Sequence, residues 1–246
     1  PAGLDEYRAM LRALGIARAV VVQPGIYRDN RATLDALASA GGLWRGVARI
    51  DDGCTDAELR RLHEAGFRGV RLDGRKGPEG LAALEAMAAR IAPLGWHVQL
   101  HLYARDLPEL ASRLAALPVD VVLDHFARVD LPEGTGQPGF RAVLELLATR
   151  RCWVKLSAPY RFGEPKPPYA GLLPFAKALV AAAPDRLVWG SDWPHASHDG
   201  FMPNDGDLLD LLTEWVPDAT TRTMILATNP ARLYDFASPE QHKEVP

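Results

Sequence analysis

The sequence predicts an α/β fold, a (β/α)8 TIM barrel that lacks its first strand in this chain. Short apolar runs alternate with stretches of helical periodicity along the 246 residues. Strands that alternate with helices at this spacing form a parallel sheet with the helices packed outside it. The length suits a single barrel domain. Seven apolar runs are present, whereas a closed barrel of this kind needs eight strands.

The first expected element is a helix near the start of the chain. Leu4, Tyr7, Leu11 and Leu14 fall on one helical face, and Gly15 is placed to end the helix. This helix has no strand before it. We therefore expect a strand-bearing segment upstream of this sequence, with the sheet of this chain open between the runs 17–24 and 186–195. The alternative is an open seven-stranded sheet that lacks no strand.

Seven strands are expected at the apolar runs, and a helical stretch follows each of them. In chain order the runs cover residues 17–24, 43–51, 67–74, 96–103, 119–128, 152–160 and 186–195. The whole chain, residues 1–246, is expected to form one barrel domain that ends in a short polar tail at 238–246.

Composition excludes several classes of protein. The net charge of −3 and the absence of a basic stripe argue against a nucleic-acid surface. No stretch approaches the ~20 consecutive apolar residues that span a membrane. Cys54 and Cys152 form no close pair and are interpreted as buried thiols in a reducing compartment, the cytoplasm. The expected partner is a small molecule, and a homo-oligomer is left open.

Functional side chains are expected where the strands end, because barrel enzymes carry their chemistry at the carboxyl ends of strands. The polar residues at these ends are His101, His125, Arg128, Arg161 and Asp192. Taken singly, each histidine has packing as its alternative role, and Asp192 has capping of the chain. Placement at the same end of several strands favours a shared site.

Alternation of side chains along a strand predicts which of these residues face the interior. Asp192 shares a face with Gly190, whose small size leaves room beside the carboxylate. His125 shares a face with Leu123 and is expected inside, above apolar residues. The adjacent Asp124 is expected to make a structural hydrogen bond.

Cations and aromatic residues at the same ends of the strands indicate the chemical nature of the ligand. Arg71, Arg128 and Arg161 lie at or just past strand ends, and arginine pairs bidentately with carboxylates. A carboxylated substrate is therefore expected. Tyr27, Tyr103 and Tyr160 are expected to close over a flat ring, with aromatic packing as the alternative.

Other motifs carry less information about function. The glycine-rich segment 74–80 lacks the spacing of a phosphate-binding loop, and no serine lies in a nucleophile elbow. His195 and His198 are expected in a loop near Asp192, where a gating role is left open.

Four segments together resemble the amidohydrolase 2 family of TIM-barrel hydrolases. They are VVLDHFAR (121–128), VKLSAPYR (154–161), RLVWGSDWPH (186–195) and NPARLYDF (229–236). Within that family the chain most resembles the branch of 2-pyrone-4,6-dicarboxylate lactonase and sugar-lactone hydrolases. The resemblance implies a metal-dependent or metal-independent hydrolase, and it is weak for the identity of the substrate.

The resemblance also implies roles for individual residues. Asp192 would activate the attacking water, and His125 would lie near the scissile carbonyl. Arg71, Arg128 and Arg161 would hold the substrate carboxylates. His101 lies where metal-binding relatives place a ligand, but the family's His-x-His motif on strand one has no counterpart in this sequence. The lactonase branch is understood to work without a metal.

We therefore expect a hydrolase that opens a carboxylated cyclic ester by general-base attack of water. One alternative keeps the fold but adds zinc or manganese at His101 and Asp192, if the upstream ligands exist, for amide hydrolysis or decarboxylation. The other alternative is an inactive, ligand-binding form.

Overall fold

The computed structural model describes residues 2–25, 27, 29–51, 53–164 and 166–237. The expected polar tail at 238–246 lies outside the described residues. Within this part of the chain, none of the helices has both the length and the apolar character needed to cross a membrane.

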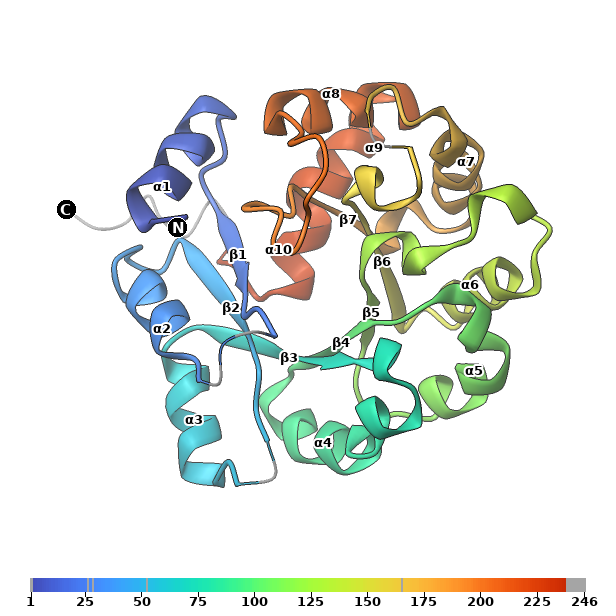
Figure 1. Ribbon diagram of the computed structural model, residues 1–246. Helices are drawn as coiled ribbons and strands as arrows, with labels where there is room; N and C mark the ends of the chain where they lie inside the picture. The colour runs from blue at the N-terminus through green and yellow to red at the C-terminus, as the bar shows by residue number, and fades with distance from the viewer. Residues whose placement is uncertain (1, 26, 28, 52, 165, 238–246) are drawn as a thin grey trace.

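Seven parallel strands form one curled sheet, a half-barrel, in which each strand pairs with its neighbours in chain order (Figure 1). The strands are β1 Ala19–Val22, β2 Trp44–Ala48, β3 Phe67–Asp73, β4 His97–His101, β5 Val121–Leu123, β6 Cys152–Ser157 and β7 Leu187–Gly190. Each lies within one of the apolar runs, so the prediction of seven parallel strands is confirmed.

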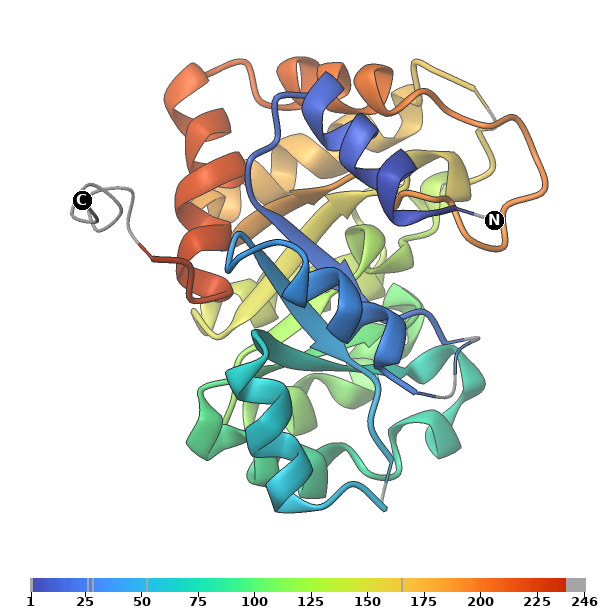
Figure 2. The same cartoon turned by 90° about the vertical axis from the view of Figure 1, so that its left-hand side faces the viewer.

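The helices lie along the sheet, and all of those described except the last, α10, cover its convex face (Figure 1). They are α1 Leu4–Ala13, α2 Arg31–Ala38, α3 Asp56–Glu64, α4 Leu84–Ile91, α5 Leu107–Ala115, α6 Pro138–Ala148, α7 Leu173–Ala182, α8 Asp205–Trp215, α9 Ala219–Thr223 and α10 Asn229–Leu233. Figure 2 looks onto α1, α2 and α3, which lie in front of β1 to β3. Side chains cap several of these helices. The Thr55 hydroxyl, for example, accepts a bond from the Glu58 amide at the start of α3.

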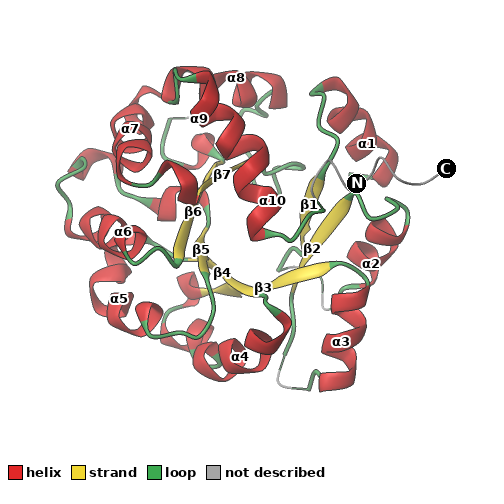
Figure 3. Cartoon of the chain, turned by 180° about the vertical axis from the view of Figure 1, so that it is seen from behind, coloured by secondary structure: helices red, strands yellow, loops and turns green. Residues whose placement is uncertain are grey.

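The sheet is open between β1 and β7. Among the described residues β1 pairs only with β2, and β7 pairs only with β6. Figure 3 shows α10 lying between the two edge strands. Leu233 and Tyr234, at the end of α10, pack with Val188 of β7 and with Val20 of β1. The expectation of an open sheet at these two strands is therefore confirmed.

The two faces of the sheet differ in polarity. Outward residues such as Leu100 and Leu156 are fully buried against the helices, and burial of each leucine contributes about 1.5–3 kcal/mol. The inward residues are apolar at the lower end, where Val122 and Trp153 lie. Toward the carboxyl ends they become charged, and this change positions the site.

The expected face of β5 is wrong. Val122 packs inside the half-barrel with Val188, whereas Val121 and Leu123 pack outward with the helices. Asp124 therefore continues the inward face. His125 still reaches the interior, because β5 ends at Leu123 and the backbone then turns into a left-handed conformation, with φ of 49° at His125.

Candidate active site

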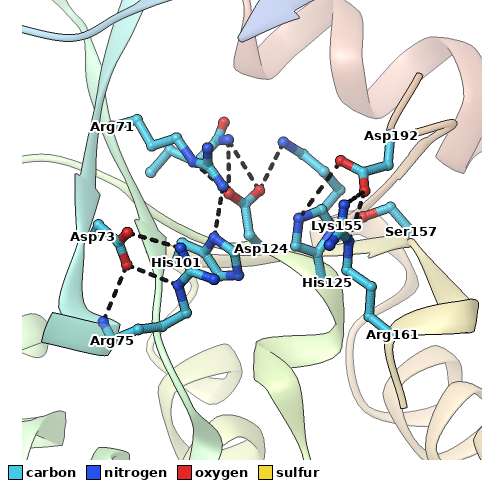
Figure 4. A network of polar contacts seen from close by, with 11 residues as sticks. Arg71, Asp73, Arg75, His101, Asp124, His125, Lys155, Ser157, Arg161 and Asp192 are labelled. Carbon is cyan, nitrogen blue, oxygen red and sulfur yellow. Dashed lines mark hydrogen bonds and ion pairs between the residues drawn. The ribbon is translucent and has the colours of Figure 1, made fainter. Parts of the chain in front are cut away.

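Asp124 lies at the centre of the polar network on the concave face (Figure 4). Its side chain is 1% exposed. Lys155 Nζ lies 2.9 Å from Oδ1, and Arg71 Nε lies 3.0 Å from Oδ2. Gln99 Nε2 donates to both oxygens, at 2.9 and 3.1 Å. Burial favours a protonated carboxyl, but Lys155 and Arg71 outweigh it and hold the pKa of Asp124 well below its usual range.

The importance of Asp124 was missed from the sequence, which predicted only a structural hydrogen bond. A signal was present. Arg71 of β3 and Lys155 of β6 both lie at inward positions of the sheet, and cations inside a protein need an anion as partner. Asp124 is the carboxylate placed between them.

His101 and His125 lie beside this carboxylate with their rings edge to face, 5.1 Å between centroids. Arg71 Nη2 lies 2.8 Å from His101 Nδ1. An arginine can only donate, so Nδ1 accepts and the ring proton sits on Nε2. That Nε2 atom is buried and has no hydrogen-bond partner among the described residues. Burial lowers the pKa of His101 to about 3, so the ring is neutral.

His125 is also held as a neutral ring. Its Nδ1 lies 2.7 Å from the hydroxyl of Ser157, and its Nε2 lies 3.8 Å from Asp192 Oδ1. Burial lowers the pKa of His125 to about 4, against the attraction of Asp192 and Asp124. If Ser157 donates to Nδ1, Nε2 carries the proton and faces the space beside Asp192.

A left-handed turn carries His125 and Arg128 to the mouth of the half-barrel. Residues 125–128 have φ values of 49°, 51°, 54° and 50°. This conformation costs roughly 1–2 kcal/mol per residue for a side chain with Cβ, and such strain is typical of functional sites. The Arg128 guanidinium lies 5.8 Å from the Tyr103 ring centroid and 5.4 Å from that of Phe162. In the described structure it has no carboxylate within ion-pair distance.

Asp192 follows β7 and faces the same space. Tyr160 donates its hydroxyl proton to Oδ2 at 2.6 Å, and Arg161 Nε donates to the same oxygen at 2.9 Å. Oδ1 faces His125 Nε2. Burial tends to raise the pKa of Asp192, but His125 and Arg161 outweigh it, so this pKa lies below its usual value. Asp192 is therefore a carboxylate at neutral pH.

His195 and His198 both lie beside the Tyr160 side chain. His195 Nδ1 lies 2.9 Å from the Tyr160 hydroxyl, and His195 Nε2 lies 3.4 Å from Asp205 Oδ1. The ring of His198 lies 4.5 Å from that of Tyr160. Sequence reasoning left His195 in a loop with only an open gating role, although its position three residues after Asp192 was a usable signal.

The remaining predicted residues lie farther from this cluster or are engaged elsewhere. Tyr27 is 53% exposed, and no side-chain contact joins it to the network in the described structure. Arg71, predicted to bind substrate, already contacts Asp124 and His101.

The residues present do not fit a divalent metal. His101, Asp124 and His125 each offer one ligand atom, and these atoms lie within 4.8 Å of one another. However, Lys155 and Arg71 already neutralise Asp124, and Arg71 also occupies Nδ1 of His101. A dication bound to this set would lie beside two fixed cations, which is electrostatically unfavourable.

Comparison with known proteins gives consistent similarities. A model of the amidohydrolase family matches residues 1–236. The chain is 40% identical to 2-pyrone-4,6-dicarboxylate hydrolase of Comamonas testosteroni, over 94% of this chain and 81% of that protein. It is 36% identical to 4-sulfomuconolactone hydrolase of Hydrogenophaga intermedia, over 94% and 78%. A ligand-free crystal structure from Agrobacterium tumefaciens matches with a TM-score of 0.86 and 30% identity, over 95% of this chain and 84% of that one.

Proposed function

This chain belongs to the amidohydrolase family and is a hydrolase of ester bonds, and from this premise we propose that it opens a lactone that carries at least one carboxylate. Two similar proteins are named as hydrolases of such lactones, a pyrone dicarboxylate and a sulfomuconolactone. Both substrates are anionic cyclic esters. The chemistry of the site supports the same class of substrate here.

The proposal rests on one observation. The two oxygens of the Asp192 carboxylate have different surroundings. Oδ2 is occupied by Tyr160 and Arg161. Oδ1 has no hydrogen-bond donor among the described residues, and it lies 3.8 Å from the Nε2 atom of a neutral His125. A water molecule beside Oδ1 would therefore meet a base and a neighbouring proton donor.

The proposed reaction begins at this oxygen. Asp192 Oδ1 takes a proton from water as the water oxygen adds to the lactone carbonyl carbon. The Nε2–H groups of His125 and His101 are placed to donate to the carbonyl oxygen as it gains negative charge. The ring C–O bond then breaks, and the proton held by Asp192 passes to the leaving oxygen. The product is a ring-opened carboxylate.

Cations around the mouth would bind and orient the substrate. Five cationic side chains lie here with three carboxylates, so two positive charges are in excess: Arg71, Arg75, Arg128, Lys155 and Arg161 against Asp73, Asp124 and Asp192. Arg128 is the side chain best placed to pair with a substrate carboxylate, because it lies against two aromatic rings and forms no ion pair within the described part of the chain. We propose that Arg161 and Arg71 contribute positive charge that attracts the anionic substrate, and that Tyr27 covers the bound ring.

We propose that the reaction needs no added metal, because fixed cations already compensate the candidate ligand set. The zinc or manganese alternative would require those ion pairs to be displaced. We also propose a cytoplasmic location, in keeping with the two free and buried thiols of Cys54 and Cys152.

The test is turnover of 2-pyrone-4,6-dicarboxylate by the full-length protein, followed by loss of ring absorbance and by mass spectrometry in ¹⁸O water. We expect ring opening with one ¹⁸O in the product carboxylate, and equal rates with and without a chelator. A protein that opens no carboxylated lactone contradicts the proposal. Activity that appears only after zinc or manganese is added supports the metal alternative instead.

A further inference from the structure

We propose that Tyr160 and His195 form a positioning chain that fixes the Asp192 carboxylate with Oδ1 toward the substrate. This inference rests on the proposed general-base role of Asp192. The two residues come from separate segments, namely the 3-10 turn Pro159–Arg161 after β6 and the turn after β7. Neither needs to touch the substrate in order to act.

The first link is the hydrogen bond between Tyr160 and Asp192. A carboxylate can only accept, so the phenol donates its single proton to Oδ2 at 2.6 Å. Arg161 adds Nε to the same oxygen. Two donors on one oxygen define the rotation of the carboxyl group and leave Oδ1 directed at His125. Arg161 is itself tied down, because Nη2 donates to the carbonyl of Ala196 at 2.8 Å.

The second link is the hydrogen bond between His195 and the phenol oxygen. Because the single hydroxyl proton of Tyr160 is used in the hydrogen bond to Asp192, the phenol oxygen can only accept from His195. Nδ1 of His195 is therefore the donor, at 2.9 Å. This assigns the tautomer of His195, with a proton on Nδ1. Tyr160 and His195 are both buried, so water does not compete freely for these bonds.

Asp205, the first residue of α8, lies beside His195 but is not a link in this chain. Its Oδ1 is 3.4 Å from His195 Nε2, and both atoms are buried without a hydrogen-bond partner among the described residues. With the ring proton on Nδ1, Nε2 can only accept, and a carboxylate oxygen can only accept as well. The chain therefore ends at His195.

His198 provides a matched comparison. Its ring also packs on Tyr160, with 4.5 Å between centroids, but its Nε2 lies 2.9 Å from the Phe201 carbonyl rather than near the phenol oxygen. If contact with the ring alone mattered, His198 and His195 would be equivalent. If the hydrogen bond matters, only His195 is important.

The experiment is a double-mutant cycle on lactone opening, with the fold of each variant checked by circular dichroism. Tyr160→Phe and His195→Ala should each lower kcat by roughly 10- to 100-fold with KM changed less than about threefold. The double variant should be no slower than Tyr160→Phe alone, because His195 acts through the phenol. His195→Asn, whose amide can replace the Nδ1–H donor, should recover most of the loss. His198→Ala should stay within about twofold of the wild type.

A pH profile adds a readout that a purely structural role would not move. The Tyr160 hydrogen bond is among the groups that lower the pKa of Asp192. The acid limb of kcat/KM should therefore shift to higher pH in Tyr160→Phe and in His195→Ala, but not in His198→Ala.

Additive losses in the double variant, or a His195→Asn variant no better than His195→Ala, would overturn the positioning chain. Wild-type activity and its loss in Asp192→Asn are measured in the same assay. A wild type that opens no lactone removes the proposed function and this inference with it. An active wild type whose variants behave additively removes the inference alone.

Discussion

At the scale of single residues, opposite charges from different strands hold the site together. Asp124 of the β5 end is bound by Arg71 of β3 and Lys155 of β6, and Asp192 is bound by Arg161. The sequence indicated Arg71, Arg161 and Asp192 from their positions at strand ends. It did not indicate that two of these side chains pair with each other, because the pairing depends on the curl of the sheet.

This pairing distinguishes Arg161 from Arg128, which were predicted, with Arg71, as substrate ligands. Arg128→Met should raise KM for a carboxylated lactone by about one to two orders of magnitude while kcat changes little, because Arg128 has no carboxylate to lose. Arg161→Met should lower kcat as well, since it frees the Asp192 carboxylate. Steady-state kinetics of both variants provide the measurement.

The matched control is an uncharged lactone. Its KM should be nearly unaffected by Arg128→Met, because the arginine then has no anion to bind. Equal losses on charged and uncharged substrates would show that Arg128 is structural.

At the scale of elements, the strands were predictable and the turns after them were not. The apolar runs predicted each strand. The period of two predicted the inward face of β7, because a strand of four or more residues imposes its own alternation. It failed at β5, which has three residues and ends in the left-handed turn 125–128. That turn contains no glycine or asparagine, the residues that most often adopt a positive φ, so the left-handed conformation could not be predicted from the sequence.

The contact between α6 and the turn after β4 gives a test of how packing supports the site. A Cβ atom on Gly139 would lie 2.4 Å from the carbonyl oxygen of Ala104, in the turn that follows His101. Alanine normally favours a helix over glycine. Here, however, backbone would have to move, so Gly139→Ala should destabilise the protein by roughly 1–3 kcal/mol.

Gly136, three residues earlier, is the control for this substitution. A Cβ there would meet nothing within 4 Å, so Gly136→Ala should leave the free energy of unfolding almost unchanged. Urea unfolding of both variants provides the measurement. Equal stability of the two variants would show that the turn after β4 is not held by α6.

At the scale of the whole molecule, the half-barrel encloses ionisable groups that control stability against acid. Burial lowers the pKa of His97 and His101 to about 3 and that of His125 to about 4. The unfolded chain takes up protons near pH 6.5 and the folded protein does not. The stabilisation is therefore complete above pH 6.5 and is lost as pH falls toward 4, by about 1.4 kcal/mol per pH unit for each histidine.

Urea unfolding at pH 7.5 and pH 5.5 should accordingly show a loss on the order of 4 kcal/mol from the three histidines together. His97→Gln, which lies outside the catalytic cluster, should reduce that loss by about a third. A free energy of unfolding that is the same at both pH values would contradict the neutral, buried state of these rings.

The architecture as a whole followed from the sequence more completely than the site did. Seven runs predicted seven strands and an open edge between β1 and β7. The packing of Leu233 and Tyr234 between these edge strands was not predicted, because it depends on the position of α10 relative to the sheet. The same limit applies to the hydrogen bond between Tyr160 and His195, which joins the turn after β6 to the turn after β7.

The central claim, that Asp192 is the general base of a lactonase, is tested most directly by kcat of Asp192→Asn. The substitution keeps the shape of the side chain and removes its basicity. The account predicts that kcat for 2-pyrone-4,6-dicarboxylate falls by a factor on the order of 10² or more, while substrate affinity stays within a few-fold. An unchanged kcat in Asp192→Asn would contradict it.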